Sequence, residues 1–511
     1  MRPKSWLLVY CSFSFLLAHP AAAADEGAIV AVRGATIHPV SGPPLSGAVL
    51  VVEGGRVKEI RADGSVPGGA TVVDASGKVI TPGFVDASSV LALAADDRRE
   101  SAAEFSVLDA VDPYAEEDIA LVRASGTTSV AVDPASRGAF AGQGAVLRLV
   151  PAGNLAAMTL KPSAFERGTL AAIAQERTTS LQRLEDYFSM QRTLAGAKEY
   201  AEQWARYRED LAEYEKKKKE YEEKKAKGEV GSTPPAPRTD SGTETPRTGG
   251  EERPGGGRRG GRPPGGGGGG GGERRRGGEG GGAGEERRPP AAEGAGALPA
   301  GGAEKTPKDA APKKPQKPAT DPGRETLARV LAGELPLFLE CHRASDIRNA
   351  LRLADEFSSV RLVLLGATEA ASVADDLRSR GVAVVVGPVV LPGPRDLARR
   401  SHDPALAARL HEKGVAVAIG SGSVAPLASR YLNLAAAAAA GEGLPRDAAL
   451  AAITLRAAEA LGVADRVGSL DPGREADFLI WDRDPIDARA RLEAVYVGGV
   501  RVSDDEMRRR G

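Results

Sequence analysis

Short apolar runs alternate with helical patterns through most of the chain, and this alternation restricts the fold more than any other feature. Runs such as "LPLFLEC", "VRLVLLG" and "VAVAIGSG" are separated by amphipathic stretches such as "SDIRNALRLADEF" and "ASVADDLRSRG". Apolar runs of this length followed by helical periodicity are typical of buried parallel strands with crossover helices. The sequence therefore predicts an α/β fold built on a TIM-like (β/α)8 barrel.

Both ends of the chain are rich in short strands. "AIVAVRGATIHPV", "GAVLVVEGGRVKEI" and "ATVVDASGKVITPG" are separated by glycine turns, and similar runs return in "DFLIWD" and "LEAVYVGGVRV". Glycine turns between alternating runs are typical of hairpins. We expect residues 25–81 and 467–511 to form one small composite β-sandwich, and residues 82–180 and 325–466 to form the two parts of the barrel.

Two segments interrupt this pattern. Residues 181–228 are a charged helix-former with an aromatic stripe at Trp204, Tyr207, Tyr214 and Tyr221. Such a stripe fits either docking on the barrel or a coiled coil, and docking is the preferred interpretation. Residues 229–324 consist mainly of Gly, Pro, Arg, Glu and Ala, and such a segment buries too little apolar surface to offset its chain entropy. The sequence predicts a helical arm followed by a disordered insert.

The Arg-Gly content of this insert raises the question of nucleic-acid binding. Its arginines are interleaved with glutamates and it lacks aromatic residues, whereas single-strand binding depends on stacking. The whole chain has 68 Lys+Arg against 69 Asp+Glu, a formal charge of -1, which gives no general attraction to polyanions. We expect a solvated loop and no nucleic-acid partner.

The first 24 residues have the features of an export signal. Arg2 and Lys4 precede an apolar run from Trp6 to Ala18, and small residues follow at Ala22 and Ala24. The apolar run is short for a membrane span, so we expect cleavage, no span afterwards, and a periplasmic or secreted protein. An uncleaved anchor is the alternative. Cys341 is then the one remaining cysteine, which leaves no intramolecular disulfide.

Several motifs together resemble the amidohydrolase superfamily, nearest to its imidazolonepropionase-like and prolidase-like branch. They are "KVITPGFVDASSV", "AGQGAVLRL", "ECHRASDI", "ALAAITLRAAEALGV" and "DRVGSLDPGREADFLIWDRDP". In the last of these, the family pattern G-S-I-x-x-G-K-x-A-D-L-x-x-x-D is matched at Gly468, Gly473, Ala476, Asp477 and Asp482. The resemblance implies a barrel that hydrolyses C–N bonds with one or two divalent ions, Zn among them, at its carboxyl-terminal mouth.

The positions that the resemblance assigns to metal ligands hold other residues. Ser88 and Val90 stand in place of the first His-x-His, and Arg148 in place of a bridging lysine. Gly366 replaces a later histidine and Gly422 replaces the final aspartate, which also serves as general base in the family. Valine and glycine side chains cannot ligate a metal, and an arginine cannot form a carbamate. The resemblance therefore implies a degenerate metal centre.

Glu340 and His342 are the strongest remaining candidates for a site. They lie two apart in "LECHRA", so on a strand they share a face and could hold one weakly bound cation or a polar ligand. A histidine bonded to Asp346 or the barrel rim is the alternative. Asp86 is a third candidate at the mouth, although an aspartate after a strand more often caps the turn. His38, His402 and His411 lack ligand spacing and are expected to be ordinary surface or hydrogen-bonded histidines.

The sequence thus leaves two functions open. One is a weak or inactive amidohydrolase-family protein that binds or scaffolds without a metal, and the other is a C–N hydrolase with a reduced single-ion site at Glu340 and His342. A small-molecule or dipeptide-like ligand suits either function. Homo-oligomer formation, the substrate and the role of the insert stay open.

Overall fold

The computed structural model describes residues 29–93, 102–134, 139–151, 154–170, 180–227, 311–389, 403–423 and 425–509. The predicted signal segment 1–24, the sequence 229–310 of the predicted insert, and His402 lie outside these ranges. The chain divides into a large unit, residues 1–209 with 316–511, and a second unit, residues 210–315.

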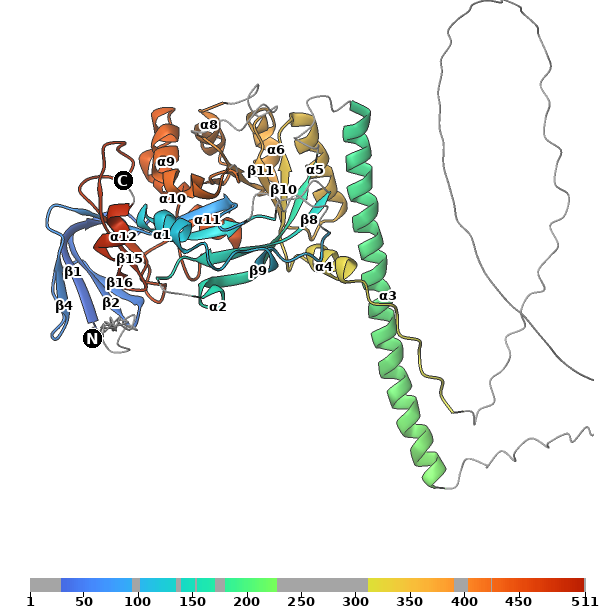
Figure 1. Ribbon diagram of the computed structural model, residues 1–511. Coiled ribbons are helices and arrows are strands. Elements are labelled where there is room, and N and C mark those ends of the chain that lie inside the picture. The colour runs from blue at the N-terminus through green and yellow to red at the C-terminus, as the bar shows by residue number, and fades with distance from the viewer. Residues whose placement is uncertain are drawn as a thin grey trace, which may run out of the picture. The chain divides into compact units, whose positions relative to one another are not determined.

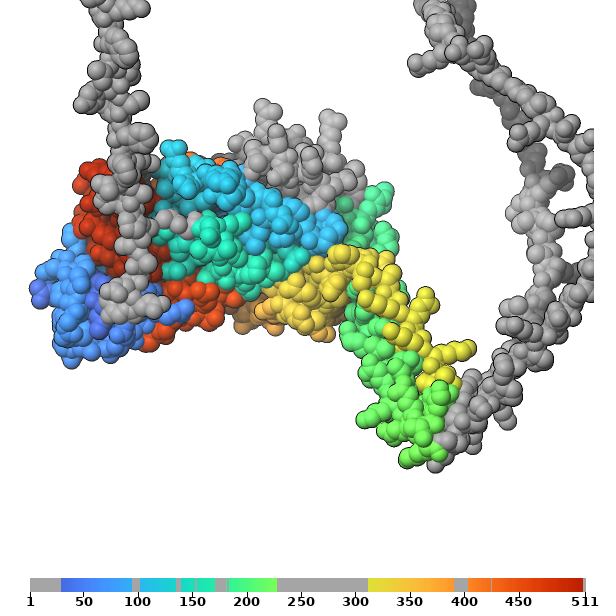
Figure 2. Space-filling model, turned by 60° about the horizontal axis from the view of Figure 1, so that its bottom comes forward, coloured from blue at the N-terminus to red at the C-terminus, as the bar shows by residue number. Residues whose placement is uncertain are grey.

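One sheet draws its strands from both ends of the chain, as the composite β-domain requires. Its order is β16-β15-β14-β5-β1-β2-β3, with β4 paired to β1. Its strands are β1 (Ile29–Ile37), β2 (Leu45–Glu53), β3 (Arg56–Arg61), β4 (Thr71–Asp74), β5 (Val79–Pro82), β14 (Phe478–Trp481), β15 (Leu492–Val497) and β16 (Val500–Arg501). The two ends meet where β5 pairs with β14, and both views show the blue and red segments side by side (Figures 1 and 2).

The second sheet forms the barrel. Its order is β13-β12-β11-β10-β9-β8-β7-β6. Its strands are β6 (Phe84–Ser89), β7 (Thr127–Val132), β8 (Phe140–Arg148), β9 (Thr159–Thr169), β10 (Leu337–Cys341), β11 (Leu362–Gly366), β12 (Ala383–Val386) and β13 (Val417–Ile419). The fold is thus the predicted α/β class: a nearly closed, eight-stranded TIM-like barrel beside a β-sandwich domain.

Many of the helices pack along one side of the barrel sheet (Figure 1). The α-helices are α1 (Glu116–Ala124), α2 (Leu155–Met158), α3 (Ser180–Ala226), α4 (Pro322–Leu331), α5 (Ala344–Glu356), α6 (Ala374–Ser379), α8 (Leu406–Glu412), α9 (Leu432–Gly441), α10 (Arg446–Ala452), α11 (Leu455–Leu461) and α12 (Asp504–Arg509). Short 3-10 turns are η1 (Val107–Asp109), η2 (Ala370–Val373) and η3 (Pro426–Tyr431).

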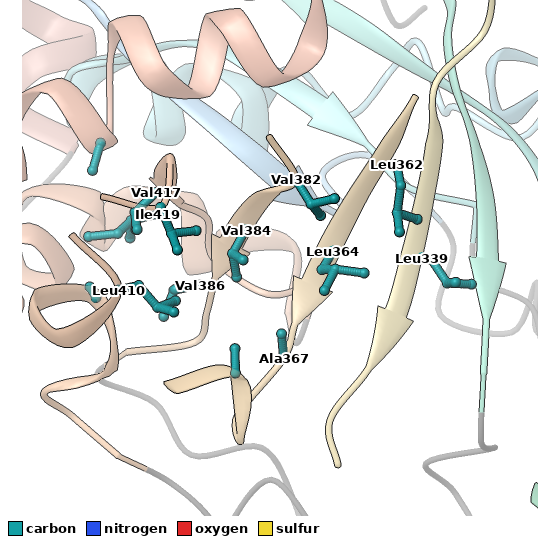
Figure 3. Packing of buried hydrophobic residues seen from close by; sticks show 14 of the residues in the cluster. Leu339, Leu362, Leu364, Ala367, Val382, Val384, Val386, Leu410, Val417 and Ile419 are labelled. Carbon is teal, nitrogen blue, oxygen red and sulfur yellow. The ribbon is translucent and has the colours of Figure 1, made fainter. Parts of the chain in front are cut away.

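Alternate residues of the barrel strands pack in two different places. Leu339, Leu364, Val384 and Ile419 belong to the large outer cluster beneath the helices, as Figure 3 shows. Their neighbours face the barrel interior, where the rings of Phe165 and Phe338 stack with centroids 4.3 Å apart. Strands buried on both faces explain why the sequence reads as continuous apolar runs.

The expectation of a fully parallel barrel is wrong at one strand. β8 runs antiparallel to both β7 and β9. Short connections join β7 to β8 and β8 to β9 without a crossover helix of the length that parallel neighbours need. β8 is therefore inverted, and its last residue, Arg148, lies at the end of the barrel opposite to the mouth.

The barrel closes between β13 and β6 through side-chain contacts. Asp86 Oδ1 accepts a hydrogen bond from Ser421 N at 2.9 Å, and Ser421 Oγ donates to Ser88 O at 2.8 Å. A Cβ added to Gly420 would meet Ser88 N at 3.0 Å, so glycine permits the close approach of the two strands. These bonds place the ends of β6 and β13 together at the mouth.

The predicted helical arm is one long helix, α3, whose first half packs on the large unit. Tyr187, Met190, Leu194 and Ala197 are buried in the outer cluster. The returning chain lies beside it: Lys317 Nζ lies 5.6 Å from the centroid of the Trp204 ring, and Asp321 N donates to Tyr200 Oη at 3.4 Å.

The predicted C-terminal limit of the insert, residue 324, lies too late in the sequence, because α4 already begins at Pro322. Asp321 caps α4 by accepting from Arg324 N at 3.0 Å, with Pro322 in the first turn, so the last three positions of the predicted insert are already helical.

Among the described residues, no helix is long and apolar enough to cross a membrane.

Candidate functional site

Polar side chains from several strands meet at the carboxyl ends of the barrel strands. We call this group the mouth cluster, defined as Asp86, Ser88, Asp133, Arg167, Glu340, His342 and Ser423. In barrels of this class, residues at this edge carry the chemistry. The cluster includes three residues singled out from the sequence, Asp86, Glu340 and His342, and one replaced ligand position, Ser88.

Arg167 and Glu340 form an ion pair across neighbouring strands. Arg167 Nη2 donates to Glu340 Oε2, and the other oxygen, Oε1, lies 3.5 Å from His342 Nε2. The side chains of Arg167 and Glu340 are 10% and 23% exposed. Burial opposes ionisation of Glu340, but the Arg167 charge and the His342 contact outweigh it and lower the pKa of that carboxyl to about 2.

His342 contacts Glu340 and not Asp346, which was the alternative partner. Asp346 instead accepts from Ser345 Oγ at 3.2 Å and lies 3.7 Å from Arg183 Nε. His342 Nδ1 and Arg167 Nη1 are buried with no hydrogen-bond partner in the described structure. Buried polar atoms without a partner are rare in folded proteins.

Asp133 is held by two hydroxyl groups. Ser88 Oγ and Ser423 Oγ each lie 2.6 Å from Asp133 Oδ2, and they lie 2.9 Å from each other. Both hydroxyls donate to this one carboxylate oxygen. Burial raises the pKa of Asp133 to about 6, against the opposing charge of Arg167 and the serine hydrogen bonds.

Asp86 is wholly buried, and its carboxylate bonds join β6 to the turn after β13, where the barrel closes. Its Oδ1 accepts from Ser88 N at 3.1 Å and from Ser421 N, and its Oδ2 accepts from Ser429 Oγ at 2.6 Å. Burial raises the pKa of this carboxyl, and the hydrogen bonds from Ser429 and Ser421 oppose the rise. Because both oxygens are engaged, Asp86 caps the turn within β6 and also holds the end of β6 to the turn after β13.

Neighbouring groups fill the space that side chains at the two replaced glycines need. A Cβ at Gly366 would meet His342 Cε1 at 2.5 Å, so the His342 ring fills the space beside β11. A Cβ at Gly422 would meet the Pro388 ring at 2.6 Å. Both glycines have positive φ, +74° and +78°, which L side chains adopt reluctantly. Val90, the remaining replaced position, is half-buried just after β6.

Arg148 does not belong to this cluster, and the alignment of Arg148 with a metal-bridging lysine is wrong. Because β8 is inverted, Arg148 lies against the β-domain, where its Nε and Nη2 donate to the two oxygens of Asp477 at 2.8 and 2.6 Å. Burial lowers the pKa of Arg148, but Asp477 and Glu475 raise it by more. Arg148 is a structural ion-pair residue.

The residues of the mouth do not fit a divalent metal. The described residues contain no group of three or more His, Cys, Asp or Glu side chains arranged to hold an ion. Glu340 is already paired with a guanidinium, and that fixed positive charge repels a cation placed between Glu340 and His342. Serine hydroxyls are poor ligands for transition metals, which need three or four convergent N, S or carboxylate donors.

Three members of the cluster were missed in the sequence. Asp133 ends the run "GTTSVAVD", and a carboxylate at the end of a buried strand was a usable signal. Arg167 lies in "SAFERGTL", which mixes polar and apolar residues without the pattern of a strand. Its place on β9 could therefore not be predicted from the sequence. Ser423 reaches Asp133 only because the turn after β13 brings its hydroxyl to the mouth, and the sequence does not predict this turn.

Comparisons with known proteins agree with this architecture. A model of the Amidohydrolase family matches residues 348–502. Imidazolonepropionase from Pseudomonas aeruginosa (strain UCBPP-PA14) is 42% identical over 128 residues, 24% of this chain and 30% of that protein. The enzyme of the same name from Paracoccus denitrificans (strain Pd 1222) is 32% identical over 176 residues, 32% of this chain and 41% of that protein. The matches thus span less than half the length of these curated relatives.

The whole fold has a counterpart among solved structures. The amidohydrolase from Thermotoga maritima MSB8 superposes with a TM-score of 0.63 at 22% identity, covering 93% of this chain and 99% of that chain. The chain is thus similar to amidohydrolases in sequence over residues 348–502 and in its overall fold.

Proposed function

We propose that this protein is a non-hydrolytic member of the amidohydrolase superfamily that works by binding, with an internal ion pair in place of a metal. One observation carries the proposal: Glu340, which with His342 is the strongest remaining candidate for a metal ligand, directs its carboxylate to Arg167. An Arg–carboxylate pair is already neutral and needs no added cation. The ligand class that suits the family is a small amide or a dipeptide-like molecule.

The rest of the mouth supports the same proposal. Hydrolysis in this family uses an ionised aspartate to take a proton from a metal-bound water. Here Gly422 stands at that position, and the nearest carboxylates, Asp86 and Asp133, are engaged with serine hydroxyls and backbone N–H groups.

A hydrolase with a single ion at Glu340 and His342 is the second candidate. Two observations favour it: Nε2 of His342 lies 3.5 Å from Glu340, and its Nδ1 has no partner. In this alternative an ion displaces Arg167 from Glu340, and the two side chains supply a carboxylate and an imidazole ligand. The two candidates make opposite predictions for the same sample.

Metal analysis of the purified protein decides between them. We expect well under one equivalent of Zn, Mn or Fe, and no chelator-sensitive hydrolysis of dipeptides or N-acyl amino acids. Arg167→Met, which removes the competing cation, should take up more zinc than wild type, whereas Arg352→Met on the exposed face of α5 should not. Stoichiometric metal in wild type, with activity lost in both Glu340→Ala and His342→Ala, would overturn the proposal in favour of the single-ion hydrolase.

We also propose that the protein is exported, on the strength of the N-terminal signal features alone. N-terminal sequencing of material from the periplasm or medium should begin near Asp25, because Ala22 and Ala24 fit the signal peptidase site. Protein that retains the apolar run from Trp6 to Ala18 would indicate an anchored form instead.

A further inference from the structure

A ligand-sized cavity lies at the end of the barrel opposite to the mouth. It has a volume of about 650 Å³ and lies between the amino ends of β10–β13, α5 and α11. Cavities of this size commonly hold small organic molecules. The amino-terminal face of a barrel of this class normally serves stability, so a cavity there needs its own explanation.

Alanines produce the cavity. Ala383 begins β12, Ala416 and Ala418 lie at the start of β13, and Ala460 lies on α11, and all of them line the space. Barrel interiors are usually filled by Val, Ile and Leu, which would occupy this volume. Val363, Val382 and Val417 supply the rest of an apolar wall; the last two are labelled in Figure 3. The wall is suited to an aryl or alkyl group.

The rim carries one cation that is not neutralised. Arg380 is bonded to Asp355 through Nε at 2.9 Å and Nη2 at 3.0 Å, and Arg456 to Glu459 at 2.6 Å. Arg361 has no carboxylate partner among the described residues; its Nη2 donates to the Glu334 carbonyl at 2.9 Å. The free donors of its guanidinium are arranged for a planar carboxylate.

A second cation nearby strengthens the positive potential. Lys161 Nζ donates to Leu461 O at 3.0 Å and Gly462 O at 3.3 Å, at the end of α11. Burial and then the charge of Arg361 lower the pKa of Lys161, and the charge of Asp465 opposes them. Asp465 thus offsets Lys161 in part, and Arg361 is the cation that lines the cavity.

We propose that this cavity is a binding site for a monocarboxylate with an apolar body, its carboxylate on Arg361 and its aryl or alkyl group against the alanine-lined wall. The site is separate from the mouth cluster and does not depend on the function proposed for it. A single unpaired guanidinium at the rim matches one negative charge, so a monocarboxylate fits better than a phosphate dianion.

Calorimetric titration of the whole protein with 4-phenylbutyrate tests the site. We expect a dissociation constant below about 1 mM, and binding roughly tenfold weaker for the uncharged 4-phenylbutanamide, since a charge-assisted contact is lost. Arg361→Gln should lose the preference for the acid, while Arg352→Gln, on α5 but outside the cavity lining, should keep it. Ala460→Leu and, independently, the exposed Ala416→Leu should fill the space and abolish binding.

Several results would overturn this proposal. They are no heat of binding up to about 10 mM 4-phenylbutyrate, equal affinity for acid and amide, unchanged binding in Arg361→Gln, or unchanged binding in both alanine variants. Tighter binding of benzyl phosphate than of the carboxylate would also reject the proposed ligand class. Thermal unfolding of each variant identifies any that fail to fold, and the two alanine variants keep the test open if one does.

Discussion

Two buried groups of ion pairs lie at opposite ends of this barrel, and they differ in completeness. In the junction cluster, defined as Arg148, Glu475 and Asp477 with Arg56 and Arg466, Asp477 accepts two bonds from Arg148 and one from Gly498 N, and Glu475 contacts all three arginines. In the mouth cluster, Arg167 Nη1, His342 Nδ1 and Asp133 Oδ1 have no partner. The junction is a finished structural contact, whereas the mouth keeps polar atoms that packing alone does not satisfy.

This difference between the junction cluster and the mouth cluster shows what the C-terminal family motif indicates in this chain. Asp477 belongs to the C-terminal motif that made the resemblance specific, and its contacts join the β-domain to the barrel. The positions that differ from the family lie at the mouth instead. A matching motif can therefore report the fold while the chemistry at the other end has changed.

The largest effect is expected from Arg148→Met. The substitution leaves Asp477, 4% exposed at its side chain, as an unpaired buried charge. Breaking a buried pair in this way costs about 4 kcal/mol of unfolding free energy. Urea unfolding measures it. The exposed pair of Arg33 and Asp74 is the control, because Arg33→Met should cost less than about 1 kcal/mol. If Arg148→Met also cost less than about 1 kcal/mol of unfolding free energy, the contact between Arg148 and Asp477 would not be important for stability.

A smaller effect is expected at the mouth. Arg167→Met should lower the unfolding free energy by about 3 kcal/mol, because Glu340 keeps some exposure and can recruit water. Adding Glu340→Met should recover most of this loss, since replacing both partners of a buried pair by apolar groups is often neutral. The double substitution Arg148→Met with Asp477→Met should recover less, because Glu475 and Gly498 N also lose a partner. Equal recovery at both ends would remove the contrast between them.

The pH dependence of stability separates the mouth from the junction. The pKa of Asp133 is raised to about 6 from its ordinary value near 3.8, so its stabilising effect is complete below about pH 3.8 and is lost as the pH rises through about 6. Between pH 4 and 7 the wild type should lose about 2 kcal/mol more than Asp133→Asn, measured as unfolding free energy in matched buffers.

Glu340 has the opposite sign. Its lowered pKa, about 2, gives stability that is present above about pH 4.5 and lost as the pH falls through about 2. The comparison with Asp133→Asn isolates the aspartate, because Glu340 is the same in both proteins. Parallel curves for wild type and Asp133→Asn would mean that Asp133 titrates normally.

The sequence predicts the fold well and the site only in part, for physical reasons. Apolar periodicity and glycine turns report burial, so the barrel and the β-domain could be read directly from them. Strand direction leaves no such trace, which is why Arg148 was assigned to the wrong end. The partner of Glu340 could not be foreseen either, because Arg167 is 173 positions away and reaches it only through the pairing of β9 with β10.

The smallest effect concerns Ser423, which contributes one of the two hydroxyls on Asp133. Ser423→Ala removes a hydrogen bond to a buried carboxyl and should cost about 1 kcal/mol of unfolding free energy. That hydrogen bond lowers the pKa of Asp133, so its loss should also move the pH transition upward relative to wild type. Ser372→Ala is the matched control, because its exposed hydroxyl donates to the Glu369 carbonyl far from Asp133. A transition that stays at the wild-type pH in Ser423→Ala would show that the two hydroxyls do not act on Asp133 together, and the three-oxygen hydrogen-bonded group would lose its support.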